Sequence, residues 1–156
     1  MQFDDDLVAF LTGGISITLA SRNAALVPST SRAKGCRVLR DAGRVRVRVF
    51  VSQLQAGDFL GDIRSTGMIS ATFTVPRTHR TLQFKSRDAR IDLVNADDLA
   101  AIATAATAFA ACIEPLGFSH EFSAAFLASP GDEVAIEFTP TDAFQQTPGP
   151  AAGERL

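Results

Sequence analysis

Residues 44–50 have the sequence RVRVRVF, in which arginine and valine alternate from Arg44 to Val49. Successive side chains of a β-strand point to opposite faces, so a period of two predicts a strand here. The valines would share a dry face, and the arginines would share a face that meets water or a ligand. A chain built around this segment needs a sheet with one buried side.

Similar alternation and turn residues predict the rest of the architecture. Strands are expected at residues 15–21, 25–38 (interrupted near Pro28 and Gly35), 44–50, 68–75, 81–94 and 133–139. A short helix capped by an aspartate is expected to open the chain and to end at residues 13–14. Further helices are expected at residues 52–66, from Asn95 or Asp97 to Cys112, and at 120–128. Six alternating strands joined by tight turns, including a hairpin at residues 41–43, predict an antiparallel barrel. The expected fold class is mainly β with flanking helices (α+β), in one domain of residues 1–156 with an irregular segment at 140–156.

Composition argues against several function classes. A net charge of −2 gives no general attraction to nucleic acid, and the absence of Trp and Tyr removes most stacking platforms for bases. No apolar run is expected to approach the roughly 20 residues of a membrane span, and the acidic N-terminus lacks a signal pattern, so a cytoplasmic protein is expected. The cysteines, Cys36 and Cys112, are expected to be reduced, and the histidines, His79 and His120, are not spaced as a metal pair.

Two basic and polar clusters are candidates for ligand binding. Residues 29–37 (STSRAKGCR) contain Arg32 and Arg37 beside hydroxyl side chains, which suits a phosphate group. Gly35 would allow close approach of a flat ring or another backbone. Residues 77–85 (RTHRTLQFK) form a second cluster, whose alternate polar side chains suit the edge of a heterocycle. The alternative is that both clusters are merely the solvated faces of strands.

The order of these segments resembles the pyridoxamine 5'-phosphate oxidase-like, FMN-binding split-barrel family over nearly the whole chain. The resemblance is carried by residues 14–21, by LVPS at 26–29 followed by SRAKG at 31–35, and by residues 76–86. It implies a six-stranded split barrel in which Arg32 contacts the flavin phosphate and Thr81 or Gln83 contacts the ring. At the helix after residue 51, where the oxidases carry basic residues, this chain has Ser52, Gln53 and Gln55. The residues expected to contact the cofactor are Arg32, Ala33, Gly35, Cys36, Arg37, Val49, Phe50, Val51, Gln53, Thr81, Gln83 and Lys85.

The resemblance also implies a homodimer with two FMN sites between subunits, and flavin-dependent oxidoreductase chemistry on a substrate that the sequence does not define. No side chain stands out as a catalytic acid or base. Two alternatives stay open. The same cleft could hold another cofactor, such as a deazaflavin or haem, which the missing basic residues near Gln53 favour, or the protein could be a structural dimer with an empty cleft.

Overall fold

The arginine–valine repeat forms strand β4 (Arg44–Ser52), an inner strand of a four-stranded antiparallel sheet with the order β3-β4-β8-β7. Val47, Val49 and Val51 are buried in the core, as the alternation predicted. The opposite face is not exposed to solvent along its whole length. Arg48 is only 4% exposed, because carboxylates from neighbouring elements surround it. The prediction of a solvated or ligand-facing arginine row was therefore wrong at Arg48.

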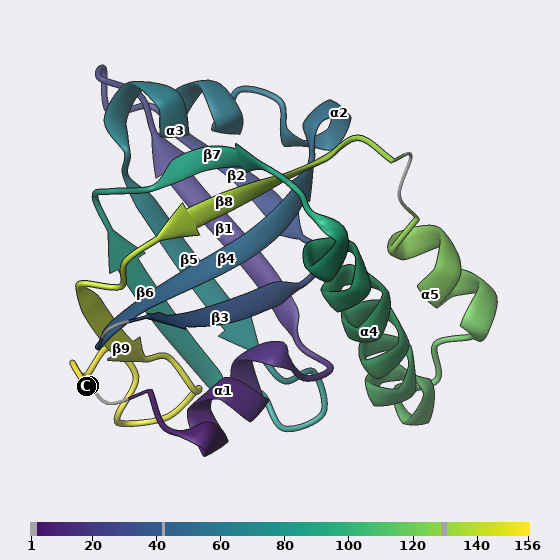
Figure 1. The fold of residues 1–156 in the computed structure, drawn as a ribbon. Helices are drawn as coiled ribbons and strands as arrows, with labels where there is room; N and C mark the ends of the chain where they lie inside the picture. Colours follow the sequence, from purple (N-terminus) through teal and green to yellow (C-terminus); the bar gives the residue numbers. More distant parts are fainter. Residues whose placement is uncertain (1–2, 42, 129–130) are drawn as a thin grey trace.

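The computed structural model describes residues 3–41, 43–128 and 131–156 (Figure 1). The remaining strands in this part of the chain are β1 (Ser16–Arg22), β2 (Pro28–Ala33), β3 (Cys36–Asp41), β5 (Ile69–Thr74), β6 (Thr81–Ser86), β7 (Arg90–Leu93), β8 (Glu133–Phe138) and β9 (Asp142–Gln145). The helices are α1 (Asp5–Thr12), α2 (Gln53–Ala56), α3 (Phe59–Thr66), α4 (Ala96–Ile113), the 3-10 turn η1 (Glu114–Leu116) and α5 (His120–Phe126).

The second sheet has five antiparallel strands in the order β2-β1-β5-β6-β9, so the α+β class with antiparallel sheets is confirmed. The core lies between the two sheets and is built from the inward-facing residues of their strands, together with apolar side chains of α1 and α3. Its largest fully buried members include Phe59, Phe73, Phe84 and Phe138. Each of these rings removes a large apolar area from water, which is the main stabilising contribution to such a domain.

The described residues contain more strands than the six expected, because two long segments bend between the sheets and β9 forms in a segment expected to be irregular. The segment predicted at 25–38 becomes β2, which pairs with β1, and β3, which pairs with β4. The segment predicted at 81–94 becomes β6, which pairs with β5, and β7, which pairs with β8. Side chains alternate with a period of two both before and after such a bend, so the alternation alone does not show where the chain passes from one sheet to the other.

Smaller differences have local causes. The helix predicted at 52–66 is divided into α2 and α3 at Gly57, whose φ of +52° favours glycine. The segment predicted as irregular, 140–156, contains β9, which extends the five-stranded sheet. The expected turns at 41–43 and 130–132 include Ala42 and Pro130, which lie outside the described residues.

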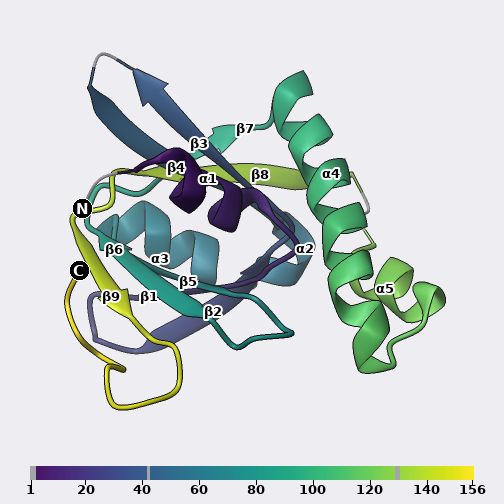
Figure 2. The same ribbon diagram turned by 90° about the horizontal axis from the view of Figure 1, so that it is seen from below.

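Helix α4 packs along one end of the two sheets and carries α5 on its outer side (Figures 1 and 2). It begins with a capping box in which Asn95 and Asp98 exchange side-chain and backbone hydrogen bonds. Residues 96–116 are long and apolar enough to span a membrane by length and composition, with a mean hydropathy of 1.7, contrary to the expectation that no apolar run approaches this length. Helices of soluble proteins also meet this criterion.

Candidate functional site

A cleft opens at the corner where β2 passes into β3. It is lined by the C-terminal end of α1, the start of β1, the corner residues 32–36, Gln55 of α2, and residues of α4 and α5. Four of the residues expected to bind the cofactor, namely Arg32, Ala33, Gly35 and Cys36, lie together in this lining. The structure therefore brings the first sequence cluster to a single concave site.

Arg32 is the cation at the mouth of this cleft. Its guanidinium donates a hydrogen bond to the Ser16 hydroxyl at 3.0 Å and lies over the Phe126 ring, 4.5 Å from its centroid. In the part of the chain that the structure describes, Arg32 forms no ion pair, whereas Arg37 and Arg48 each pair with carboxylates. An arginine without a counter-ion beside a cleft retains its charge and its planar donor fork for an anionic ligand.

Lys34 lies deeper in the same lining and is 8% exposed. Its Nζ donates to the backbone oxygen of Ala128 at 2.5 Å, and the nearest carboxylate oxygen, on Glu133, lies at 3.5 Å. The ammonium is therefore only loosely paired for a buried charge, since charge-assisted bonds between N and O are usually 2.7–2.9 Å long. Together with Arg32, it gives the lining of the cleft two basic side chains.

Gly35 allows the close approach of a backbone, one of the two roles expected for it. A Cβ at this position would lie 3.2 Å from Cβ of Ala105 and 3.4 Å from Cα of Ile102, so it is α4 of the same chain that approaches the glycine closely. Gly14 forms a second such contact, because a Cβ there would lie 2.3 Å from the backbone oxygen of Ala108. The two glycines allow α4 to pack closely against the corner, so that α4 forms one wall of the cleft.

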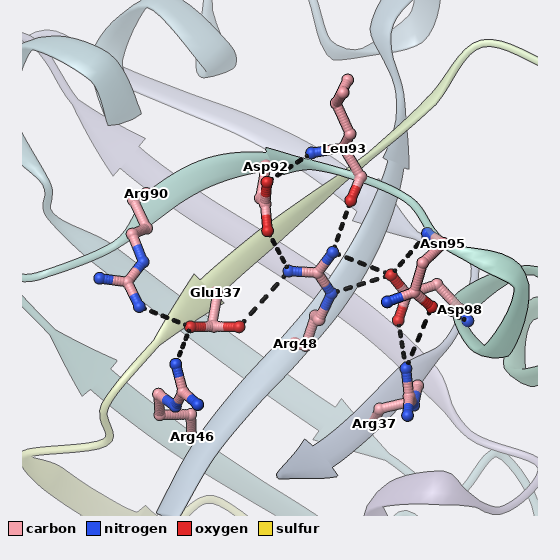
Figure 3. Close-up of polar contacts among 9 residues, drawn as sticks. All are labelled: Arg37, Arg46, Arg48, Arg90, Asp92, Leu93, Asn95, Asp98 and Glu137. Carbon is pink, nitrogen blue, oxygen red and sulfur yellow. Dashed lines mark hydrogen bonds and ion pairs between the residues drawn. The ribbon is translucent and has the colours of Figure 1, made fainter.

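Arg37 points away from the cleft and joins an ion-pair network beside the start of α4 (Figure 3). It donates to Asp98 at 2.7 Å and to Asp97 at 3.1 Å. Arg48 donates to the other oxygen of Asp98 at 2.9 Å, to Asp92 at 2.9 Å, and to the backbone oxygen of Leu93 at 2.6 Å. The Arg37 guanidinium expected to bind phosphate is thus held by two aspartates.

Glu137 is the second buried acid of this network. It accepts hydrogen bonds from Arg46 and Arg90, both at 2.7 Å, and from Arg48 at 3.4 Å. Burial alone would raise the pKa of Glu137, but the bond from Arg90 and the charges of Arg46 and Arg48 hold it below its ordinary value. The network joins β3, β4, β7 and β8 to α4 and is structural.

Asp98 shows the same balance of effects. It is fully buried, which alone would raise its pKa, but the bonds from Arg48, Arg37 and the Asn95 backbone N–H lower the pKa below its ordinary value. Its carboxylate is thus held ionised in a buried position.

Four other expected site residues lie on or after β4, outside the cleft lining. Val49 and Val51 are buried core residues, and Phe50 is fully buried on the opposite face of the strand. Gln53 begins α2 and donates through its side chain to the backbone oxygen of Asp132 at 3.1 Å. Of the residues around α2, it is Gln55 rather than Gln53 that reaches the cleft.

Thr81, Gln83 and Lys85 lie on β6, separated from β2 by two strands. The register aligns Arg32 with Thr18, Thr72 and Gln83 across the sheet, so all four occupy one row on its outer face. Three strand spacings correspond to about 14 Å, so Arg32 and Gln83 of one chain do not hold the same end of a ligand. Helix α5 reaches one end of this row, where Phe126 lies against Arg32, and the other described helices lie away from this face (Figure 2).

Several lining residues were not among those predicted. Lys34 stands within the first cluster but was not singled out, and Gln55 was noted only as a departure from the family. Phe109 and Phe126 come from helices distant in sequence, and nothing in their local sequence indicates that they would meet Arg32. The enclosed part of the cleft is small, about 60 Å³, which holds only a few water molecules.

Comparisons with known proteins agree with this architecture. The sequence matches no protein-family model and no curated protein. Among solved structures, HupZ from Group A Streptococcus is similar with a TM-score of 0.56 at 14% identity, covering 97% of this chain and 100% of that one. A candidate pyridoxamine 5'-phosphate oxidase from Lactobacillus delbrueckii has a TM-score of 0.53 at 10% identity, covering 92% and 93% of the two chains.

General Stress Protein 26 from Bacillus anthracis has a TM-score of 0.50 at 11% identity, and the match covers 100% of this chain and 98% of that one. The chain therefore has the pyridoxamine 5'-phosphate oxidase-like fold that the sequence resemblance implied. At these identities the similarity establishes the fold, and the ligand has to be argued from the site itself.

Proposed function

We propose that this chain is a flavin-binding protein in which the cleft at the β2–β3 corner receives the phosphate of FMN. The observation that carries this proposal is Arg32, an arginine without a carboxylate partner among the described residues, placed at the mouth of a cleft that also contains Lys34. Two cations and the amide of Gln55 are suitable donors for the oxygens of a phosphate group.

The bound flavin would supply hydride or electron transfer, as an oxidoreductase requires. This chain would contribute the anchoring of the phosphate, the orientation of the ring and the exclusion of water by α4. No acid or base among the lining residues is assigned to proton transfer, and the substrate is left open.

A deazaflavin carrying a phosphate would use the same donors, so it is the nearest alternative to FMN. Haem is less well supported by the lining of this cleft. His79 lies in the turn before β6, and His120 begins α5 and faces the groove between α4 and α5. The Cys36 thiol does line the cleft, but burial raises its pKa, which disfavours the thiolate that would bind iron.

We also propose a homodimer in which a second copy covers the outer face of the five-stranded sheet. That face presents Arg32, Thr18, Thr72 and Gln83 in one row. A two-fold arrangement would allow the polar residues of β6 in one subunit to approach the cleft of the other, which they do not reach within one chain. In this way Thr81, Gln83 and Lys85 would take part in the site.

The flavin proposal is tested by titrating the purified protein with FMN and following the quenching of flavin fluorescence. Arg32→Ala should weaken FMN binding by about 10-fold or more, since a hydrogen bond to a charged group contributes about 1.5–3 kcal/mol. Arg44→Ala is the matched control, because Arg44 is exposed at the start of β4, away from the cleft. Wild-type protein that binds neither FMN nor a deazaflavin, as measured by native mass spectrometry, would contradict the proposal.

A further inference from the structure

Arg32 and Lys34, the two cations of the cleft, both contact one short segment of the same chain. Arg32 lies over the ring of Phe126, and Lys34 donates to the backbone oxygen of Ala128. Phe126 ends α5, and Ala128 follows two residues later. Residues 126–128 therefore contact both cations, beside the Ser16 hydroxyl at Arg32 and the Glu133 carboxylate at Lys34.

Phe126 also occupies a position suited to a flat ring. It stacks on Phe109 of α4, with the ring centroids 5.8 Å apart and the planes inclined by 16°. Its other neighbours are the Arg32 guanidinium and Phe122, which is stacked at 5.7 Å. A ring stacked on one aromatic and adjacent to a guanidinium has the environment that proteins offer to planar heterocycles.

The segment is held weakly. Helix α5 packs on α4, and Ser123 is the one residue of α5 that is buried. Phe126 is 41% exposed and Phe122 is 45% exposed, so displacing α5 would remove little apolar area from the interior. Elements with few buried apolar contacts are those that open most readily in a folded protein.

The position of α5 also limits the size of the site. Phe126 and Leu127 line the cleft, and with both in place the enclosed space is about 60 Å³. Displacing Phe126 and Leu127 would enlarge this space for the ring of a flavin.

We infer that residues 118–128 form an internal cover whose Phe126 ring and Ala128 carbonyl take the places of the ring and the anionic group of the ligand. The ligand class is a planar aromatic molecule carrying a phosphate, which displaces both contacts and opens α5. The identity of that ligand rests on the proposed function, but the covering of the cleft does not.

The cover can be tested without a ligand because Cys36 lines the cleft and is 3% exposed. The measurement is the rate of N-ethylmaleimide labelling of Cys36, followed by peptide mass spectrometry so that Cys112 is counted separately. Phe126→Ala should raise this rate by about two- to five-fold, the change expected when an exposed cation–π contact is lost. Leu99→Ala is the control, since Leu99 is 52% exposed on α4 and belongs neither to the cleft lining nor to residues 118–128.

The FMN titration supplies the second readout. Tighter FMN binding by Phe126→Ala, with faster Cys36 labelling, supports the whole inference. Unchanged Cys36 labelling overturns it, even if FMN binds. Faster labelling without any FMN binding keeps the cover and rejects the flavin function, whereas weaker FMN binding by Phe126→Ala shows that Phe126 holds the ligand and overturns its role as a stand-in.

Discussion

Arg37 of β3 and Arg48 of β4 lie directly opposite each other across the antiparallel pair. Like charges in this register repel, and the repulsion is offset by the carboxylate of Asp98, which accepts from Arg37 through one oxygen and from Arg48 through the other. Asp98 belongs to the first turn of α4, so the same contact fixes the helix to the sheet.

Asp98→Asn should therefore be strongly destabilising. The substitution keeps the shape of the side chain but leaves two arginines without their shared counter-ion, and removing one partner of a buried ion pair costs about 3–5 kcal/mol. Asp97→Asn is the neighbouring control, because the Asp97 side chain is 77% exposed and its pair with Arg37 should contribute less than about 1 kcal/mol. Urea unfolding measures both, and equal losses would contradict the assignment.

Stability should fall in acid because of the same network. The pKa values of Asp98 and Glu137 are lowered in the folded protein, so the unfolded chain binds more protons as the pH falls. Their contribution is complete above the ordinary carboxyl pKa of about 4 and is lost as the pH falls through the lower folded values. Urea unfolding measured from about pH 7 to about pH 3 should show this loss of stability. The free energy of unfolding of Glu137→Gln should fall less steeply with decreasing pH. An unchanged slope in that variant would argue against Glu137 as a contributor.

Gly14→Ala should weaken the packing of α4 against the rest of the domain. The added Cβ would meet the Ala108 backbone oxygen at 2.3 Å, so the helix must shift, at a cost of about 1–3 kcal/mol. Gly61→Ala is a matched control, since Gly61 lies within α3 with no atom within 4 Å of the new Cβ. That control should gain about 0.5–1 kcal/mol from helix propensity. Thermal unfolding followed by circular dichroism separates the two, and a neutral Gly14→Ala would contradict the close contact.

The proposed dimer can be tested at Thr18, which is exposed on the outer face of β1. Thr18→Arg would place a charge in the middle of the shared face and should convert the dimer into a monomer on size-exclusion chromatography with light scattering. Thr104→Arg, at an exposed position of α4, should leave the dimer intact. A monomeric wild-type protein, or a dimer lost only in Thr104→Arg, would place the interface elsewhere.

The sequence predicted most strands and the class of fold because side-chain alternation is a local property. It gave the valine face of β4 correctly, and it brought Arg32 and Cys36 into one site through the family resemblance. It did not predict that Arg48 would be buried, since Asp92, Asp98 and Glu137 reach it from elements 44 to 89 residues away in the chain.

The cleft was only partly predictable for the same reason. Arg32 and Arg37 look alike in the sequence, and their different surroundings depend on where α4 and α5 pack. Lys34 and Phe126 are 92 positions apart in the chain and yet line the same cleft. These contacts follow from tertiary packing, which no local pattern in the sequence encodes.

The three interactions of Asp98 have an evolutionary consequence. Its side chain completes the capping box with Asn95 and neutralises the charges of both Arg37 and Arg48. A replacement that keeps one of these contacts therefore loses the others. Divergent descendants of this protein should therefore either retain the aspartate with both arginines or exchange all three together for apolar side chains. Intermediates that keep two cations and lose the acid should be depleted by selection.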